Sequence, residues 1–380
     1  MARIPTTSEI NAWVSAGAAE SMTLEFKAQP WGNNDEAKRE CLKDITALAN
    51  TRGGLIVVGI AESNNAASAL SPLSAEDAEK ERGRINDLIA GGVEPRLYGV
   101  DVEAVPVDGG AVLAIAVPRS ASRPHRITAR GHNRYWLRNS TGVYEANVAD
   151  LRALFLQSAE IGERALRWHD ERRAAIRAGH VVSNIAPDPD AMVLHLIPAD
   201  AFAPQATQLD LKVLHGNARQ FWPIGATGFN PQYTFDGFLA VPGTDPCSTY
   251  TLVQRNGIVE AIEIGLRGGQ HNLIYPARLE QDLVDATNRY AASLFSLGIV
   301  PPVYVVATIE GVQGAEFARR HYSVSIPQEK LALPVVVVES AASEQEIASA
   351  LRPALDALYN AAGFVGSPSF NEEGEYVSKV

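Results

Sequence analysis

The chain has 380 residues, 46% of them hydrophobic and 20% charged, which is long enough for two ordinary globular domains. No apolar run approaches the roughly 20 residues needed to cross a bilayer, and the first residues lack the apolar core of a signal peptide. We therefore expect a cytoplasmic protein with no membrane partner. The net charge of −11 argues against general affinity for nucleic acid. The acidity is uneven, because residues 1–155 hold 17 Lys and Arg against 19 Asp and Glu, and residues 156–380 hold 16 against 25.

The N-terminal part of the chain predicts a mixture of helices and strands. Thr7 or Ser8 could cap the first helix, Asn34 caps the second, and Asp108-Gly-Gly110 is typical of a hairpin turn. A continuous apolar run predicts a strand that is buried on both faces at residues 55–60. We expect helices over residues 7–17, 34–50, 74–90 and 148–179, and strands over 22–29, 55–60, 100–107, 111–117 and 135–137.

The C-terminal part predicts a second domain with a mainly β core. Strands are expected over residues 192–197, 238–241, 250–254, 258–264, 303–309 and 335–339, and helices over 279–297 and 344–361, the last one interrupted at Pro353. His195, His215 and His271 look isolated, so we expect structural or surface roles for them. The fold class is therefore α+β with α/β elements. Residues 1–158 form a mixed-sheet domain, 159–189 a connecting helix and linker, and 190–380 an α/β or α+β domain.

The strand over residues 22–29 carries the first candidate site. Glu25 and Lys27 are two residues apart, so they share one face, and Leu24 and Phe26 share the other. Glu20 lies an odd number of residues from Glu25, so it is expected on a turn before the strand. Carboxylates around Mg²⁺ or Mn²⁺, with a lysine beside them, are suited to phosphodiester cleavage. A surface ion pair between Glu25 and Lys27 is the alternative.

The segment Asn50-Thr-Arg-Gly-Gly54 is the second candidate site. Its backbone N–H groups could cradle a phosphate. In a P-loop, however, the glycines precede a helix, whereas here they follow one, and no Gly-Lys-Ser or Gly-Lys-Thr comes after them. A helix C-terminus that leads into a buried strand explains the same residues.

A third candidate is a run of basic residues without any acid, in which aromatic residues are interleaved. Arginine forks bind phosphates and aromatic rings stack on unpaired bases, so this run predicts contact with RNA or single-stranded nucleic acid. A solvated loop and strand face is the alternative. The candidate nucleic-acid-binding residues are Arg123, His125, Arg126, Arg130, Arg134, Tyr135 and Arg138.

Taken together, these motifs resemble the Schlafen AlbA-type domain, which is also described as an ATP-binding relative of AAA proteins. The resemblance covers roughly residues 8–158. It rests on the order and spacing of Glu20-x4-Glu25-Phe-Lys27, Ala49-Asn-Thr-Arg-Gly-Gly54, Val58-Gly-Ile-Ala-Glu62, Arg123-Pro-His125 and Arg134-Tyr-Trp-Leu-Arg-Asn-Ser-Thr141. The C-terminal part is similar to the companion region of bacterial proteins of this kind.

The resemblance implies an endoribonuclease of the kind that cuts tRNA and rRNA. Carried over to this chain, the divalent metal ligands are Glu20, Glu25 and Glu62, and Lys27 completes the catalytic set. The family pattern usually has Asp where this chain has Glu62. Vertebrate Schlafen proteins carry two copies of the lobe and a zinc site, whereas this chain shows one copy, so the resemblance implies a homodimer.

We therefore predict a Mg²⁺- or Mn²⁺-dependent endoribonuclease for structured RNA such as tRNA, with a role in stress or anti-phage defence implied by the family. One alternative is a nucleic-acid-binding or transcriptional regulator without turnover. The other is a nucleotide switch that holds ATP at the Gly-Gly segment.

Overall fold

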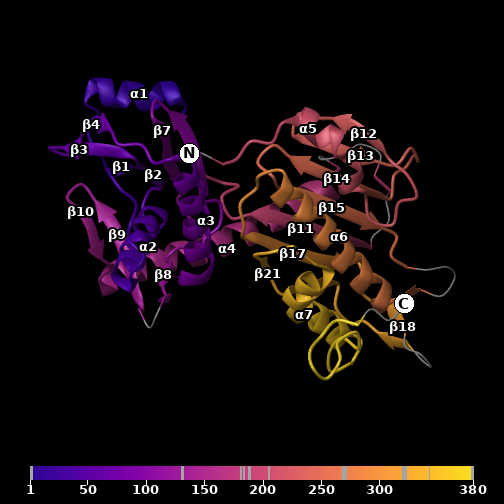
Figure 1. Ribbon diagram of the computed structural model, residues 1–380. Coiled ribbons are helices and arrows are strands. Elements are labelled where there is room, and N and C mark those ends of the chain that lie inside the picture. The colour runs from indigo at the N-terminus through magenta and orange to yellow at the C-terminus, as the bar shows by residue number, and fades with distance from the viewer. Residues whose placement is uncertain are drawn as a thin grey trace. The chain divides into compact units, whose positions relative to one another are not determined.

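The computed structural model describes residues 3–129, 132–179, 182, 185–186, 190–203, 206–267, 272–318, 323–341 and 343–377. Arg130, His271 and much of the expected linker lie outside these residues. The chain divides into two compact units, residues 1–159 and residues 160–380 (Figure 1). Both contain helices and sheets, which confirms the α+β class. In the part of the chain that is described, no helix is both long and apolar enough to span a membrane.

The N-terminal unit is built on a mixed four-stranded sheet. Its strands are β1 (Leu24–Lys27), β2 (Gly54–Val58), β7 (Gly110–Val117) and β6 (Asp101–Val107), in that order. β1 runs parallel to β2, while β2–β7 and β7–β6 are antiparallel. All five residues of β2 are buried, so both faces of the sheet need a cover.

Helices supply that cover. α1 (Thr7–Ala16) packs on one face, and α2 (Asp35–Asn50) and α3 (Ala75–Gly92) pack on the other. The alternation along β2 decides which side chain goes where, since Leu55 and Val57 join the cluster around Ile10, whereas Ile56 and Val58 join the cluster around Leu42 and Ile45.

Side-chain caps begin these helices. Asn34 caps α2, as predicted, and Ser74 caps α3. The cap of α1 is Thr6 rather than Thr7 or Ser8, because Thr6 and Glu9 form a reciprocal capping box. α1 ends at Gly17, whose left-handed φ of 59° suits a residue without a Cβ.

The strand predicted over residues 55–60 ends earlier than expected, at Val58 of β2. The apolar run over residues 55–60 is interrupted at Gly59, where φ is 103°. The chain then turns into a hairpin of β3 (Ile60–Ser63) and β4 (Ala66–Leu70), which the sequence did not predict.

A second small sheet is formed by β10 (Gly142–Glu145), β9 (Arg134–Asn139), β8 (Arg126–Ile127) and β5 (Val93–Glu94), in that order.

The C-terminal unit is built on a larger, antiparallel sheet. Its strand order is β12 (Asn230–Tyr233), β13 (Gly237–Val241), β14 (Thr249–Gln254), β15 (Val259–Ile264), β11 (Ala191–Pro198), β17 (Val303–Glu310) and β20 (Lys330–Ala332), and β21 (Val336–Val338) also pairs with β17. The remaining short elements are α5 (Leu211–Gly216), a 3₁₀ turn (Ala218–Phe221), β16 (Leu273–Ile274), β18 (Glu316–Ala318) and β19 (Ser323–Ser325).

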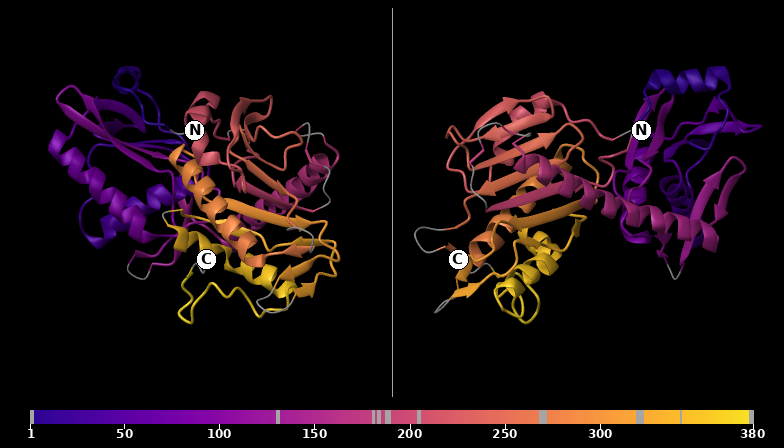
Figure 2. Two further views of the ribbon diagram at one scale, coloured as in Figure 1. Left: turned by 90° about the vertical axis from the view of Figure 1, so that its right-hand side faces the viewer. Right: turned by 180° about the vertical axis from the view of Figure 1, so that it is seen from behind.

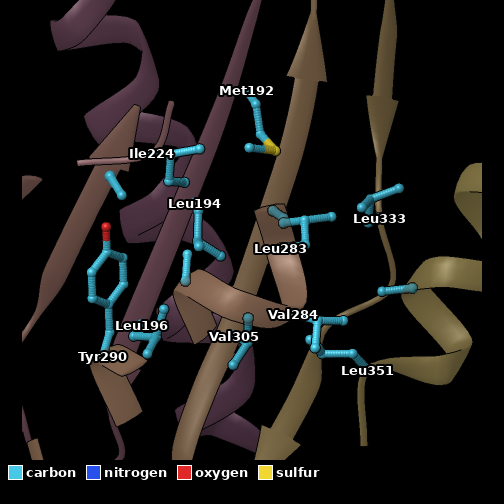
Figure 3. Packing of buried hydrophobic residues seen from close by; sticks show 14 of the residues in the cluster. Met192, Leu194, Leu196, Ile224, Leu283, Val284, Tyr290, Val305, Leu333 and Leu351 are labelled. Atoms are coloured by element: carbon cyan, nitrogen blue, oxygen red, sulfur yellow. The ribbon is translucent and has the colours of Figure 1, made fainter. Parts of the chain in front are cut away.

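The main core of this unit lies between the sheet and the helices α6 (Pro276–Ser296) and α7 (Glu344–Ala361). Figure 3 shows Leu194 and Leu196 of β11 among side chains of α6, including Leu283 and Val284. α7 runs without interruption through Pro353, contrary to prediction. Pro353 is exposed, and the buried side chains before and after it keep the helix on the core.

The opposite face of the same sheet is covered by the second half of α4 (Val148–Arg177), seen from behind in Figure 2. Here His195 is not isolated, which corrects the prediction. Its Nδ1 lies 2.6 Å from Nδ1 of His169, and its Nε2 lies 3.1 Å from Oε2 of Glu260. Arg172 of α4 and Tyr250 also donate to Glu260, so the buried carboxylate is fully paired. His215 is a surface histidine stacked on a tyrosine.

This histidine pair predicts acid sensitivity. Burial lowers the pKa of His169 from 6.5 to about 2, with His195 adding to the effect, and burial also lowers the pKa of His195. The unfolded chain therefore binds more protons than the fold below pH 6.5. Above pH 6.5 the two histidines should not change the free energy of unfolding. Below pH 6.5 the free energy of unfolding should fall by about 1.4 kcal/mol per pH unit for each of these histidines. The free energy of unfolding of His169→Gln, measured with urea, should fall less steeply as the pH is lowered, while His215→Gln should keep the pH dependence of the wild type. Equal pH dependence in all three proteins would contradict a buried neutral His169.

The Gly-Gly segment gives a second prediction. A Cβ at Gly54 would lie 2.6 Å from the backbone oxygen of Thr23, whereas a Cβ at Gly83 of α3 meets nothing within 4 Å. Gly54→Ala should destabilise the protein by about 1–3 kcal/mol through overpacking. Gly83→Ala should stabilise it by up to about 1 kcal/mol through helix propensity. Melting curves of the two variants test the pair, and a neutral Gly54→Ala would disprove the close packing.

Candidate functional site

The site begins on β1, where strand alternation places Glu25 and Lys27 on one face and buries Phe26 on the other, as predicted. Lys27 Nζ lies 2.7 Å from Oε1 of Glu25. It also lies 3.0 Å from Oδ2 of Asp44, which the indole Nε1–H of Trp31 reaches at 3.1 Å. The lysine is thus held between two carboxylates that come from a strand and from a helix.

Asp44 is a member of this candidate site that the sequence reasoning missed. It stands on the buried face of α2 between Cys41 and Leu48, and only 5% of its surface is exposed. An acid within the apolar stripe of an amphipathic helix was the available signal, since such a residue is rarely buried without a partner.

Arg138 completes the group from β9. Its guanidinium pairs with Oε2 of Glu25 and donates to the backbone oxygen of Ser21 at 3.3 Å. We call the set Arg138, Glu25, Lys27, Asp44 and Trp31 the polar row. It joins β9, β1 and α2 through consecutive charge-assisted contacts.

The electrostatics of the polar row follow from burial and pairing. Burial acts to raise the pKa of Glu25, but Lys27 and Arg138 outweigh it and the pKa is lowered. Burial also acts to lower the pKa of Lys27, yet Asp44 and Glu25 raise it well above its usual value. The pKa of Asp44 is raised by burial and by Glu25. Lys27 therefore stays charged at neutral pH and can act as a fixed positive charge, but not as a base.

Glu20 and Glu62 lie beside this row. Glu20 precedes the turn before β1, as predicted, and its Oε1 accepts a hydrogen bond from the backbone N–H of Phe26 at 2.7 Å. Its own N–H donates to the oxygen of Asn65 at 2.8 Å, which ties it to the β3–β4 hairpin that carries Glu62. Burial raises the pKa of Glu20, and repulsion from Glu62 and Glu25 adds to this. Glu20 is thus close enough to both Glu62 and Glu25 to be affected by their charges.

The fit of a divalent cation depends on two of these acids. Within the described ranges, no three His, Cys, Asp or Glu side chains are grouped as metal ligands. Glu25 is turned toward Lys27 and Arg138, whereas Glu20 and Glu62 repel each other without a cation between them. Mg²⁺ is commonly held by one or two carboxylates, with water and substrate phosphate as the other ligands. Glu20 and Glu62 fit that kind of site.

The segment Asn50–Gly54 is explained by packing. The Asn50 side chain donates to the backbone oxygens of His125 and Trp136, and its Oδ1 accepts from the N–H of His125. A Cβ at Gly53 would lie 2.6 Å from the backbone of Arg119. These contacts occupy the segment that the sequence offered as a phosphate cradle.

The predicted nucleic-acid-binding residues divide into two groups. Arg123 and His125 are 9% and 0% exposed and make contacts within the fold, so their contact with nucleic acid stays a prediction. Arg123 donates to Ser120 and Gln157, and the ring of His125 lies between Pro95 and Ser120. Arg138 is also buried, and its guanidinium is committed to Glu25. Burial of the two guanidinium charges requires such partners, so all three side chains are engaged within the protein in this structure.

Three other residues of the run are at least partly accessible. Arg126 pairs with Glu94 at 2.7 Å and Arg134 pairs with Glu145 at 2.8 Å, both as surface ion pairs that a phosphate can replace. Tyr135 is half-buried, and its ring contacts Phe155 of α4 edge-on. Arg130 lies outside the described residues.

Comparison with known families agrees with the geometry of this unit. Residues 20–147 match the family model "Schlafen, AlbA_2", so the N-terminal unit carries a Schlafen AlbA-type domain. This family points to a function related to nucleic acid. No curated protein matches the chain.

Solved structures offer two distant likenesses. The DIP2311 protein from Corynebacterium diphtheriae is 21% identical with a TM-score of 0.26, and the match covers 38% of this chain and 27% of that one. The N-terminal domain of a RecG-related protein (ATP-dependent DNA helicase) from Nitrosomonas europaea is 17% identical with a TM-score of 0.27, over 34% of this chain and 85% of that one. The matched region is thus about a quarter of the Corynebacterium protein, and neither likeness bears on function.

The polar row predicts a specific pattern of stability. Lys27→Met should destabilise the protein by about 2–3 kcal/mol, because it leaves two carboxylates facing each other. The value lies below the range for fully buried pairs because the lysine side chain is 26% exposed. Adding Asp44→Asn should recover part of the loss, since it removes the repulsion. A double-mutant cycle by urea unfolding measures this, and strictly additive losses would contradict the row.

Proposed function

We propose that the N-terminal unit is a divalent-metal-dependent endoribonuclease that acts on structured RNA such as tRNA. The observation that carries the proposal is the proximity of Glu20 to both Glu62 and Glu25, beside the charged Lys27 that pairs with Glu25. The Schlafen AlbA_2 match supports a nucleic-acid substrate.

In this proposal Lys27 stabilises negative charge on the scissile phosphate. Its side chain is 26% exposed, so it can contact a ligand while Glu25 and Asp44 hold its position. Preorganised charges of this kind are effective because they need no reorientation during the reaction. Arg138 contributes indirectly, because it orients Glu25.

Glu20 and Glu62 would hold Mg²⁺ or Mn²⁺, and Glu25 would join them only by giving up one of its cations. The metal would supply a bound water of lowered pKa and neutralise phosphate charge. Arg126 and Arg134 would hold the RNA backbone, since both are at the surface.

The test is cleavage of total tRNA by the purified full chain with Mn²⁺. Discrete fragments should appear with wild type, disappear in EDTA, and fall by at least about a hundredfold in Glu62→Gln and Glu20→Gln, which remove the metal ligands. Glu76→Gln, an exposed acid on α3, is the matched control and should cut normally.

A regulator that binds RNA without turnover is the second candidate. The engagement of Glu25 by two cations favours it, because that carboxylate is then not free for a metal. Wild-type protein that binds tRNA equally with Mn²⁺ and with EDTA, and never cuts it, would overturn the nuclease proposal and establish the regulator. Thermal stabilisation by ATP without any RNA binding would instead favour a nucleotide switch.

A further inference from the structure

A second concave feature of the N-terminal unit lies between α2 and the strands β8 and β9. It is a pocket of about 190 Å³. Its lining residues are Glu36, Arg39, Glu40, Lys43, Ile127, His132, Arg134 and Trp136. None of the residues of the proposed metal site lines it.

Charge in the pocket is mixed, with three cations and two acids. Lys43 pairs with Glu40, and Arg134 pairs with Glu145. Arg39 is half-buried and makes no ion pair with another described residue. Its guanidinium is therefore a charged donor in the pocket that a phosphate could engage without displacing an ion-pair partner.

Trp136 and Ile127 supply the apolar part of the lining. The Trp136 ring is half-buried, and the ammonium of Lys43 lies 5.6 Å from its centre. A lone phosphate would be repelled by Glu36 and Glu40, whereas a nucleobase can donate its N–H groups to carboxylates while its ring contacts Trp136 and Ile127. The mixture of donors, acceptors and an indole therefore suits a nucleotide better than a bare anion.

The volume of the pocket limits how large a bound group can be. Sites that enclose a whole small molecule have volumes of roughly 300–1,000 Å³. A pocket of about 190 Å³ instead holds one group of a longer ligand. Trp136 of the pocket and Arg138 of the polar row are two residues apart on β9, so they share a face and lie about 7 Å apart along the strand.

We propose that this pocket binds one unstacked nucleotide of a single-stranded RNA segment, with the base against Trp136 and its phosphate on Arg39. The inference rests on the proposed function, because it places the RNA strand that the polar row would act on. It adds a subsite that selects single-stranded over fully paired RNA.

The experiment measures binding of a short single-stranded RNA to the full chain in EDTA, so that catalysis does not interfere. Trp136→Leu should weaken binding about tenfold through lost stacking. Arg39→Gln should weaken it several-fold and lower the slope of affinity against salt by about 0.7, the value for one lost phosphate contact. Arg82→Gln, which makes the same change on α3 outside the pocket, is the control and should bind as wild type.

An RNA with one abasic position supplies the matching change in the ligand. The abasic site is moved along the RNA one position at a time. At one position it should weaken wild-type binding as much as Trp136→Leu does, and there it should not weaken binding by Trp136→Leu any further. Arg39→Gln should lose affinity equally for both strands, since it contacts phosphate. Because Trp136 also packs against the core, Arg39→Gln keeps the test valid if Trp136→Leu fails to fold.

The outcomes separate the two proposals. If wild type binds RNA and neither pocket variant binds more weakly than Arg82→Gln, the proposed pocket is wrong and the proposed function is unaffected. If wild type binds no RNA, the proposed function fails, and the pocket is tested with free nucleoside monophosphates by thermal shift. A shift that Arg39→Gln abolishes would retain a nucleotide pocket, and no shift would overturn it.

Discussion

The ammonium of Lys27, held between the carboxylates of Glu25 and Asp44, is the interaction on which the N-terminal unit depends. A partly buried charge is stable only when its partners offset the loss of hydration. Here the partners come from β1 and α2, so their ion pairs connect the edge strand of the sheet to the helix on its face. Any movement of α2 would leave a carboxylate or the lysine unpaired.

Arg138 extends this constraint to β9. Because it pairs with Glu25, the small sheet of β9 is held beside the main sheet, and the pocket next to Trp136 is held beside the polar row. The same contacts that stabilise the fold therefore bring the proposed metal site, the fixed positive charge and the nucleotide pocket into one unit. A structural and a functional role for these residues are not alternatives.

The arginine run illustrates why composition alone misleads. Five arginines without an acid predict a nucleic-acid surface, but Arg123 and Arg138 are buried and paired within the protein. Arg126 and Arg134 remain at the surface. A charged side chain on a strand can face either a ligand or a neighbouring element, and strand alternation says only that alternate residues share a face.

Local rules determined much of the fold. Interactions within a few residues explain the helix caps, the alternation of Glu25 and Lys27, and the turn before β1. The motifs of the family resemblance are likewise short stretches of sequence. Only the tertiary structure decided that Asp44 joins the site and that Arg138, 113 residues along the chain, pairs with Glu25. The contact between His169 and His195 belongs to the same class. Such pairs depend on how whole elements pack, and no short-range pattern carries that information.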